Sequence, residues 1–155
     1  MAVTVKRITL WRAEVANEPG VLARTLEPLA ASGADLRLVM GYRLPQTPER
    51  SAIEVFPVSG KKVTSAAEGA GLAAANEIPC LLVEGDNRPG LGAVIARALA
   101  DAGINIAFLV AQVIGRKFTA TVGFGDEAAA ATATRVIKAA AAPAKKAKPA
   151  RRKRR

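Results

Sequence analysis

The chain matches itself when it is shifted by 70 positions, and this internal repeat restricts the fold more than any other feature of the sequence. No gap is needed between Glu14 and Gly41. The identical residues of the two copies are Glu14 and Glu84, Asn17 and Asn87, Pro19-Gly20 and Pro89-Gly90, Ala23 and Ala93, Leu29-Ala30 and Leu99-Ala100, and Gly33 and Gly103. Self-similarity at one fixed period indicates that a single supersecondary unit occurs twice.

Each copy begins with the pattern of a strand followed by a helix. The apolar segments 8–11 and 80–83 predict the first strands, and the Pro-Gly pair that follows each of them predicts the start of a helix, because proline fits the first helical turn. Pro28 lies inside the first of these helices and is expected to kink or shorten it. Gly33 and Gly103 are expected to end the two helices in a left-handed conformation.

Two more strands and a second helix follow in each copy. We expect strands at about 35–43 and 51–58 and a helix at 62–74 in the first copy, and strands at about 105–113 and 118–124 and a helix at 126–141 in the second. Each repeat therefore has the order β-α-β-β-α, which is most of a ferredoxin-like split β-α-β layout. The predicted fold class is α+β, with two ferredoxin-like repeats of the βαββαβ type, antiparallel sheets and the helices on one face.

A complete unit of this type would have a fourth strand, for which the sequence leaves little room. Only residues 75–79 separate the last helix of the first copy from the first strand of the second copy. The first copy either lacks its last strand or runs this strand straight into the first strand of the second copy. Only the tail follows the second copy, so we expect that copy to lack the strand. Missing edge strands leave unpaired backbone groups, and we therefore expect the units to cover these edges against each other or in a homodimer.

The composition argues against catalysis and against a metal site. The chain has no histidine and only one cysteine, Cys80, which lies in an apolar stretch. No serine lies in a nucleophile elbow, and no carboxylates cluster at metal spacing. The Gly-x-Gly segments 69–71 and 123–125 do not complete a phosphate-binding fingerprint. We therefore expect no enzymatic activity, no metal and no cofactor.

The sequence favours a cytoplasmic protein. A single cysteine cannot form an internal disulfide, which fits a reducing compartment. No apolar run reaches the roughly 18 residues that span a bilayer, and no apolar segment of a secretion signal follows the first charged residues. We expect no association with a membrane.

The net charge of +10 lies almost entirely at the end of the chain. The basic residues of the segment 142–155 are Lys145, Lys146, Lys148, Arg151, Arg152, Lys153, Arg154 and Arg155, and the segment has no acidic residue. The other 15 basic residues and all 13 acidic residues lie in residues 1–144, which are therefore nearly neutral. A segment of Ala, Pro, Lys and Arg buries no apolar surface and is predicted to be disordered. It either binds nucleic acid without sequence preference, through counterion release, or is a solubilising extension.

The order of these motifs resembles the ACT domain, a family of small βαββαβ modules that bind amino acids and regulate metabolic enzymes. The shared pattern is an apolar strand, Asn-x-Pro-Gly, an amphipathic helix, and Gly-x-[Asn/Asp]-[Ile/Leu] before two more strands. The resemblance covers about residues 4–141, with one ACT-like repeat at 4–75 and another at 76–141, and the chain is similar to small stand-alone tandem ACT proteins. In the second repeat, the segments 86–90 and 103–107 resemble the serine-sensing ACT domain of phosphoglycerate dehydrogenase.

The resemblance implies a ligand site at an interface between two ACT units. In the family, the loop after the first strand contacts the ligand from one side, and the start of the second strand contacts it from the other. The matching positions are Asn87, Arg88, Pro89, Gly90, Leu91, Asn105 and Ile106 in the second repeat, and Asn17, Gly20 and Asp35 in the first. Gly85 stands where the serine-sensing domain has a histidine, which argues against serine as the ligand. The implied function is regulation, without catalysis, through the binding of a free amino acid.

Simpler structural roles exist for the same residues. An asparagine before a helix commonly caps it by accepting a backbone N–H, and a loop arginine such as Arg88 is usually solvated. Asn87 and Asn105 lie at the two ends of one helix, roughly 21 Å apart at 1.5 Å per residue, so they would meet only where two units pack together. A function of a different class also fits the sequence, namely an oligomerising structural adaptor that the basic tail tethers to nucleic acid.

Overall fold

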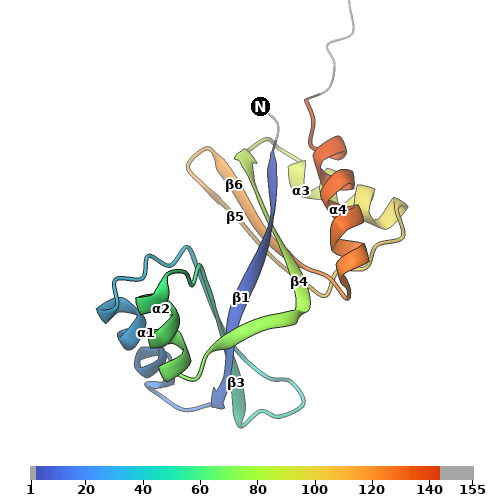
Figure 1. Cartoon of the computed structure of the whole chain (residues 1–155). Helices are drawn as coiled ribbons and strands as arrows, with labels where there is room; N and C mark the ends of the chain where they lie inside the picture. Colours follow the sequence, from blue (N-terminus) through green and yellow to red (C-terminus); the bar gives the residue numbers. More distant parts are fainter. Residues whose placement is uncertain (1–2, 144–155) are drawn as a thin grey trace, which may run out of the picture.

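The computed structural model describes residues 3–143, which form one six-stranded antiparallel sheet and four helices (Figure 1). The strands are β1 (Thr4–Ala16), β2 (Leu38–Arg43), β3 (Arg50–Phe56), β4 (Ala73–Asp86), β5 (Phe108–Ile114) and β6 (Lys117–Gly123). The helices are α1 (Val21–Ala31), α2 (Lys61–Gly69), α3 (Leu91–Asp101) and α4 (Glu127–Ala140). The strand order across the sheet is β2-β3-β1-β4-β6-β5. The antiparallel sheet and the helices agree with the predicted α+β class.

The chain passes twice through the order strand, helix, strand, strand, helix. We use "first half" for the C-terminal part of β1 with α1, β2, β3 and α2, and "second half" for the C-terminal part of β4 with α3, β5, β6 and α4. The largest difference from the expected elements concerns the two first strands. The sequence predicts them at 8–11 and 80–83, whereas β1 has 13 residues and β4 has 14. These strands are long because each of them serves both halves.

The fourth strand of each half comes from one of these shared strands. β1 and β4 pair antiparallel from Thr4 with Glu84 to Arg12 with Ala73. The beginning of β4 is the fourth strand of the first half and runs straight into the first strand of the second half, which is one of the two predicted alternatives. The beginning of β1, at residues 4–8, is the fourth strand of the second half.

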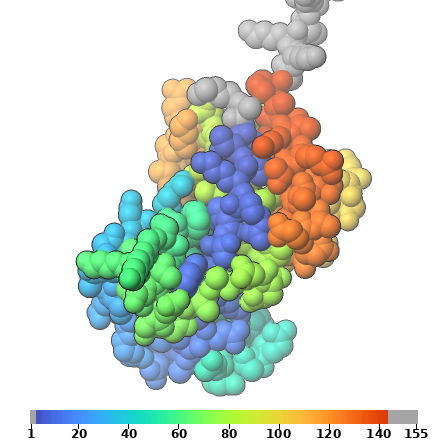
Figure 2. All heavy atoms as spheres, viewed as in Figure 1, coloured from blue at the N-terminus to red at the C-terminus, as the bar shows by residue number. Residues whose placement is uncertain are grey.

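The prediction that the second copy lacks a fourth strand is therefore wrong. The strand comes from the N-terminus of the chain and not from residues that follow α4, and Figure 2 shows β1 as a continuous blue band that reaches from one half to the other. A missing strand is thus no reason to expect a homodimer. The edges of the sheet are β2 and β5.

Glycines determine where α1 and α3 begin. Gly20 and Gly90 are the N-cap residues, with φ of +87° and +80°, and neither helix has a side-chain cap. Glycine adopts this left-handed conformation without steric cost. The interpretation of Asn17 and Asn87 as helix caps is therefore wrong.

Pro28 lies within α1 but does not shorten it. α1 has 11 residues, the same number as α3, which has no proline. Proline removes the hydrogen bond to the carbonyl of Arg24, four residues earlier. Both residues are exposed, so water can satisfy this carbonyl. At the other end of each helix, Gly33 and Gly103 have φ of +84° and +69°, as expected for the residue that stops the helix.

The helices of both halves cover the same face of the sheet and bury one apolar cluster in each half. The cluster of the first half includes Ala13, Leu29, Ile53, Val55, Ala67 and Leu72. The cluster of the second half includes Val3, Val5, Leu81, Val83, Leu99, Phe124 and Ile137. Val3 and Val5 belong to the second cluster, so the first residues of the chain complete the core of the second half.

A third apolar cluster lies on the opposite, helix-free face. It centres on Ile8 and Leu10 of β1 and on Cys80 and Leu82 of β4, and Phe56 of the first half packs against it. Phe108 of the second half packs there as well, so the sheet curls and the helix-free faces of the two halves approach each other. Burial raises the pKa of the Cys80 thiol to about 11, which keeps it protonated at neutral pH.

Two further sequence predictions concern the basic tail and the association with a membrane. The basic residues of the segment 142–155 lie outside the described residues. Within residues 3–143, no helix has both the length and the apolar character needed to cross a membrane.

Candidate ligand-binding site

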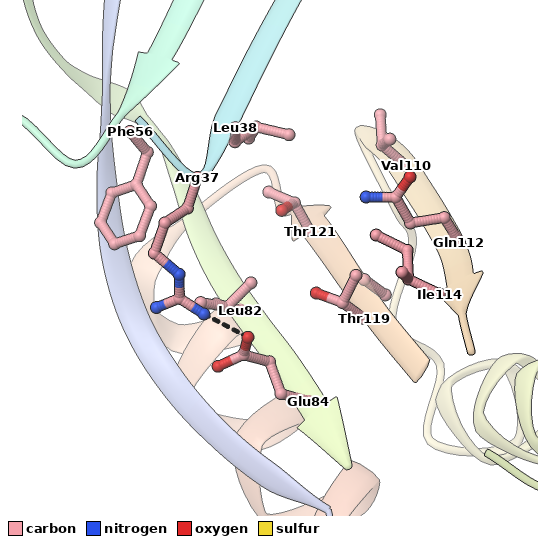
Figure 3. Close-up of a pocket in the computed structure, with 11 residues that line it drawn as sticks. Arg37, Leu38, Phe56, Leu82, Glu84, Val110, Gln112, Ile114, Thr119 and Thr121 are labelled. Atoms are coloured by element: carbon pink, nitrogen blue, oxygen red, sulfur yellow. Dashed lines mark hydrogen bonds and ion pairs between the residues drawn. The ribbon is translucent and has the colours of Figure 1, made fainter. Parts of the chain in front are cut away.

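A pocket of about 300 Å³ opens on the helix-free face, at the place where the two halves meet (Figure 3). The residues that line it are Arg37, Leu38 and Phe56 of the first half, and Leu82, Glu84, Val110, Gln112, Ile114, Thr119, Ala120 and Thr121 of the second. Small-molecule sites have volumes of roughly 300–1,000 Å³. The pocket is therefore large enough for a small metabolite. We call it the central pocket.

An ion pair between Arg37 and Glu84 crosses the central pocket. Arg37 comes directly before β2, and its backbone N–H donates to the carbonyl oxygen of Phe56 at 2.8 Å. Glu84 lies in β4 between its neighbours Thr4 and Thr119. The two charged side chains point toward each other from different halves of the molecule (Figure 3).

This ion pair is accessible to solvent. The side chain of Arg37 is 50% exposed and that of Glu84 is 31% exposed. Ion pairs between exposed side chains contribute roughly 0–1 kcal/mol to stability. A ligand could therefore replace either partner at little cost.

The remaining walls of the central pocket combine polar and apolar groups. Thr119 and Thr121 of β6 and Gln112 of β5 offer two hydroxyl groups and one amide. Six apolar residues complete the walls, namely Leu38, Phe56, Leu82, Val110, Ile114 and Ala120. Apolar walls with a few well-placed polar groups are typical of sites for small ligands.

The corresponding face of the first half carries a buried polar cluster instead of a pocket. Glu54 is only 3% exposed, and its Oε1 accepts a hydrogen bond from the Tyr42 hydroxyl at 3.2 Å. Nη1 of Arg12 lies 3.7 Å from the same oxygen, and Nη2 of Arg12 lies 2.8 Å from Oε1 of Glu14. These long side chains fill the face, so it has little room for a ligand. We call Arg12, Tyr42 and Glu54 the polar cluster.

The polar cluster is electrostatically unfavourable for a carboxylate. Burial raises the pKa of Glu54 above its ordinary value, although the guanidinium of Arg12 acts in the opposite direction. Burial and the neighbouring Glu54 also raise the pKa of Tyr42. Nε of Arg12 and Oε2 of Glu54 are buried without a hydrogen-bond partner.

Comparison with known proteins identifies the fold. No protein-family model and no curated protein matches the sequence. A protein from Bacteroides thetaiotaomicron has a similar structure, with a TM-score of 0.68 and 14% identity over 84% of this chain and 88% of that chain. The regulatory subunit of aspartate kinase from Thermus thermophilus matches with a TM-score of 0.60 and 17% identity, over 90% of this chain and 97% of its own. The corresponding subunit from Thermus flavus matches with a TM-score of 0.56 and 18% identity, over the same shares of the two chains.

The chain has an ACT-like fold. At these low identities the likeness concerns the fold alone. Within the ACT-like fold, the start of β2 in the first half faces the end of β4 in the second half, and the central pocket lies between them.

The asparagine of the first loop has a structural role in this ACT-like fold. The side-chain amide of Asn17 donates to the carbonyl oxygen of Pro48 at 3.0 Å, and its side-chain oxygen accepts from the hydroxyl of Ser51 at the same distance. The side chain of Asn17 therefore holds the β2–β3 connection. The backbone N–H of Asn17 donates to the carbonyl oxygen of Glu49. In the second half, the backbone N–H of Asn87 donates to the carbonyl oxygen of Arg116 in the β5–β6 turn.

The predicted loop residues of the second half also have structural partners. Arg88 donates to the carbonyl oxygen of Ala140 at 3.4 Å, so it holds the C-terminal end of α4 and is not simply solvated. The backbone N–H of Leu91, another residue of the predicted ligand site, donates to the carbonyl oxygen of Arg88 at 3.1 Å. Pro89 and Gly90 are exposed in the turn before α3.

The residues predicted at the start of the second strands lie apart from these loops. Asn105 is exposed and lines a shallow hollow beside the start of α4, which Asn87 does not line. Ile106 packs against the apolar cluster of the second half. Asp35 is exposed, two positions before Arg37. A single chain thus does not bring Asn87 and Asn105 into one pocket.

The absence of a side chain at Gly85 has a steric reason. A Cβ atom there would lie 3.0 Å from Cα of Val3, because β1 passes close to β4 at this point. The fourth strand of the second half therefore disfavours a side chain at position 85.

Arg37 and Glu84 do not belong to the site that the sequence predicts. A signal for Glu84 was present, because it interrupts an apolar strand and matches Glu14 in the repeat. Arg37 stands between two leucines in the same way. Among the described residues, no group of three or more histidine, cysteine, aspartate or glutamate side chains could hold a metal ion.

Proposed function

We propose that this protein is a regulatory, non-catalytic protein that binds a free amino acid in the central pocket, between two ACT-like units at 4–75 and 76–141. The observation that carries the proposal is the Arg37–Glu84 pair, which offers one cation and one anion from different units across a pocket of small-molecule size. The likeness of the fold to regulatory subunits of aspartate kinase supports a regulatory role.

The charges of the central pocket match those of an amino acid. At neutral pH the ligand carries an α-carboxylate and an α-ammonium group. The carboxylate pairs with the guanidinium of Arg37, whose planar fork suits carboxylates, and the ammonium pairs with the carboxylate of Glu84. The ligand thereby replaces one weak ion pair by two and connects the two units.

The other walls accommodate the side chain of the ligand. Leu38, Phe56 and Leu82 offer apolar contact on one side, and the hydroxyl groups of Thr119 and Thr121 offer hydrogen bonds on the other. The ligand can regulate because it connects the start of β2 with β4, two segments that belong to different units. A ligand that binds both units favours the arrangement in which they are close together.

A thermal-shift screen with the twenty amino acids is the first test. A ligand that binds only the native state raises the melting temperature by mass action. Calorimetry with the best ligand then compares the wild type with Arg37→Gln and Glu84→Gln. Loss of a hydrogen bond to a charged group costs roughly 1.5–3 kcal/mol, so each variant should weaken binding at least about tenfold.

Matched controls separate this site from others. Arg97→Gln removes another exposed arginine that also faces an acidic residue, Asp101, and should leave binding unchanged. Asn87→Ala and Asn105→Ala test the site that the sequence predicts between two copies. If these two variants weaken binding about tenfold and Arg37→Gln does not, the ligand lies at the loops and not in the central pocket.

A second candidate function rests on the charge distribution. Eight basic residues and no acidic residue lie between Lys145 and Arg155. An adaptor that this tail tethers to nucleic acid would bind DNA or RNA weakly, without sequence preference, and with an affinity that falls steeply as salt rises. Deletion of residues 143–155 should abolish this binding. Equal binding by the truncated chain would rule the tail out as the contact.

A further inference from the structure

A row of polar side chains crosses three strands along the central pocket. Glu84 of β4 lies opposite Thr119 of β6, and Thr119 lies opposite Gln112 of β5. All three residues line the pocket, so their side chains stand side by side on the helix-free face. Because adjacent strands lie roughly 4.8 Å apart, the row extends over about 10 Å. We call these three residues the Glu84–Gln112 row.

The next row on the same three strands is mostly apolar. Leu82 lies opposite Thr121, and Thr121 lies opposite Val110. Leu38 and Phe56 of the first half add further apolar groups to the same pocket. A ligand that lies along the Glu84–Gln112 row would therefore have polar partners on one flank and apolar contacts for its methylene groups on the other.

The two neutral side chains of the Glu84–Gln112 row are available to a ligand. Within residues 3–143, neither the Thr119 hydroxyl nor the Gln112 amide has a hydrogen-bond partner. In Figure 3 the amide of Gln112 points from β5 toward the threonines of β6. In the first half, by contrast, the residue that corresponds to Gln112 is Tyr42, whose hydroxyl already donates to Glu54. Only the second half thus has a free polar group at this position.

The charges of the central pocket restrict the side chain of its ligand. The α-carboxylate and the α-ammonium group of an amino acid would pair with Arg37 and Glu84, which are the only charged residues among the described residues that line the pocket. A charged ligand side chain would then lose water without meeting an opposite charge. A purely apolar side chain would leave Thr119 and Gln112 without hydrogen bonds. A neutral side chain that ends in an amide avoids both costs.

We infer that the central pocket selects amino acids with a side-chain amide, and that Gln112 recognises this amide. The inference rests on the proposed amino-acid function of the pocket. A primary amide has both donors and an acceptor, so the ligand amide can donate to the side-chain oxygen of Gln112 and accept from its nitrogen. The Thr119 hydroxyl, which stands between Glu84 and Gln112, can bind the same amide.

Calorimetry with the full chain tests the selection. Glutamine is compared with glutamate, which has the same shape but a negative charge, and with methionine, which has a similar length but no amide. The wild type should bind glutamine at least about fivefold more tightly than either, the factor expected for one or two neutral hydrogen bonds. Asparagine and aspartate are the corresponding shorter pair, and the pair that binds more tightly serves as the reference.

Variants of Gln112 assign the selection to this residue. In Gln112→Leu the preference for the amide should fall below about twofold, because the hydrogen bonds are lost. In Gln112→Lys the preference should reverse in favour of the acidic ligand, because lysine supplies the opposite charge. Gln46→Leu is the matched control, since Gln46 is exposed outside the pocket and is the only other glutamine of the chain. It should keep the preference of the wild type.

The proposed function and this inference fail in different ways. If no amino acid binds with an affinity that depends on Arg37, the pocket is not an amino-acid site and both are wrong. If an amino acid binds and Arg37→Gln weakens it, but the wild type favours the acidic or apolar ligand, only the inference is overturned. The same holds if Gln112→Leu and Gln112→Lys keep the preference for the amide.

Discussion

The helix-free face of the first half is filled by the polar cluster, whereas the same face of the second half surrounds an open pocket. The corresponding residues, matched through the strand registers, are Arg12 and Leu82, Glu54 and Thr121, and Tyr42 and Gln112. In the first half, a long cation and a long anion meet and exclude water. In the second half, shorter or uncharged side chains leave a space of about 300 Å³. Two faces with equivalent strands thus differ because of side-chain length and charge, and only one of them offers a site.

The fourth strands of the two halves, by contrast, contribute to the cores in the same way. In the second half, the fourth strand buries Val3 and Val5 beneath the helices, at 7% and 8% exposure. In the first half, Leu72, directly before β4, is 2% exposed and belongs to the first cluster. The two halves thus differ on the helix-free face and not in how the fourth strand completes the core.

The largest expected effect comes from breaking the polar cluster. Arg12→Leu gives the first half the residue found at Leu82 and leaves the carboxylate of Glu54 buried without its cation, so it should destabilise the protein by roughly 3–5 kcal/mol. The double variant Arg12→Leu/Glu54→Thr reproduces both residues of the second half and should recover most of this loss. Urea unfolding at pH 7 measures both values. An Arg12→Leu variant as stable as the wild type would show that the cluster contributes nothing.

A charge in a fourth strand should be costly only where the side chain is buried. Val5→Asp places a carboxylate among buried apolar side chains, and we expect a loss of about 3 kcal/mol or more from the lost apolar burial and the cost of the buried polar group. Ala74→Asp, at an exposed position of the fourth strand of the first half, should cost less than about 0.5 kcal/mol, as most exposed substitutions do. The comparison of their unfolding midpoints checks this. Equal losses would mean that Val5 is not part of the core of the second half.

A smaller effect, which depends on pH, is expected from Glu54→Gln. The folded-state pKa of Glu54 is raised, so ionisation costs stability at pH values above the ordinary pKa of the carboxyl group, and this cost is complete above the folded-state pKa. The amide removes this cost, and the melting temperature at pH 7 should rise by roughly 2–4 °C if the gain is near 1 kcal/mol.

The same variant has a built-in control. Below about pH 4 the carboxyl group is protonated in both folded and unfolded chains, so the advantage of Glu54→Gln should disappear there. A constant difference at all pH values would contradict the assignment of the effect to ionisation of Glu54.

The local features of the fold could be predicted from the sequence, because they depend on nearby residues. The Pro-Gly pairs mark the helix starts, Gly33 and Gly103 mark the helix ends, and apolar periodicity marks the strands. The order of elements in each half follows from these signals. Pro28 did not have the expected effect, because its position in α1 faces water.

The role of the N-terminus as the fourth strand of the second half could not be predicted, because this pairing joins residues far apart in the sequence. Residues 4–8 pair with residues 80–84, and nothing in either segment specifies the other. The central pocket was missed for the same reason, since Arg37 and Glu84 approach each other only when the sheet curls. The predicted site consists of motif residues before the first helix and at the second strand of each repeat, and several polar groups of the loop residues already have structural partners.

The most direct test of the account is a calorimetric cycle between Arg37 and the carboxylate of the ligand. The amino acid that binds best and its α-amide, which lacks the carboxylate charge, are each titrated into the wild type and into Arg37→Gln. If Arg37 binds the carboxylate, the amide should bind the wild type at least about tenfold more weakly, and Arg37→Gln should bind the two ligands with nearly equal affinity. If the amide loses the same factor with both proteins, the carboxylate does not contact Arg37, and the central pocket is not the amino-acid site.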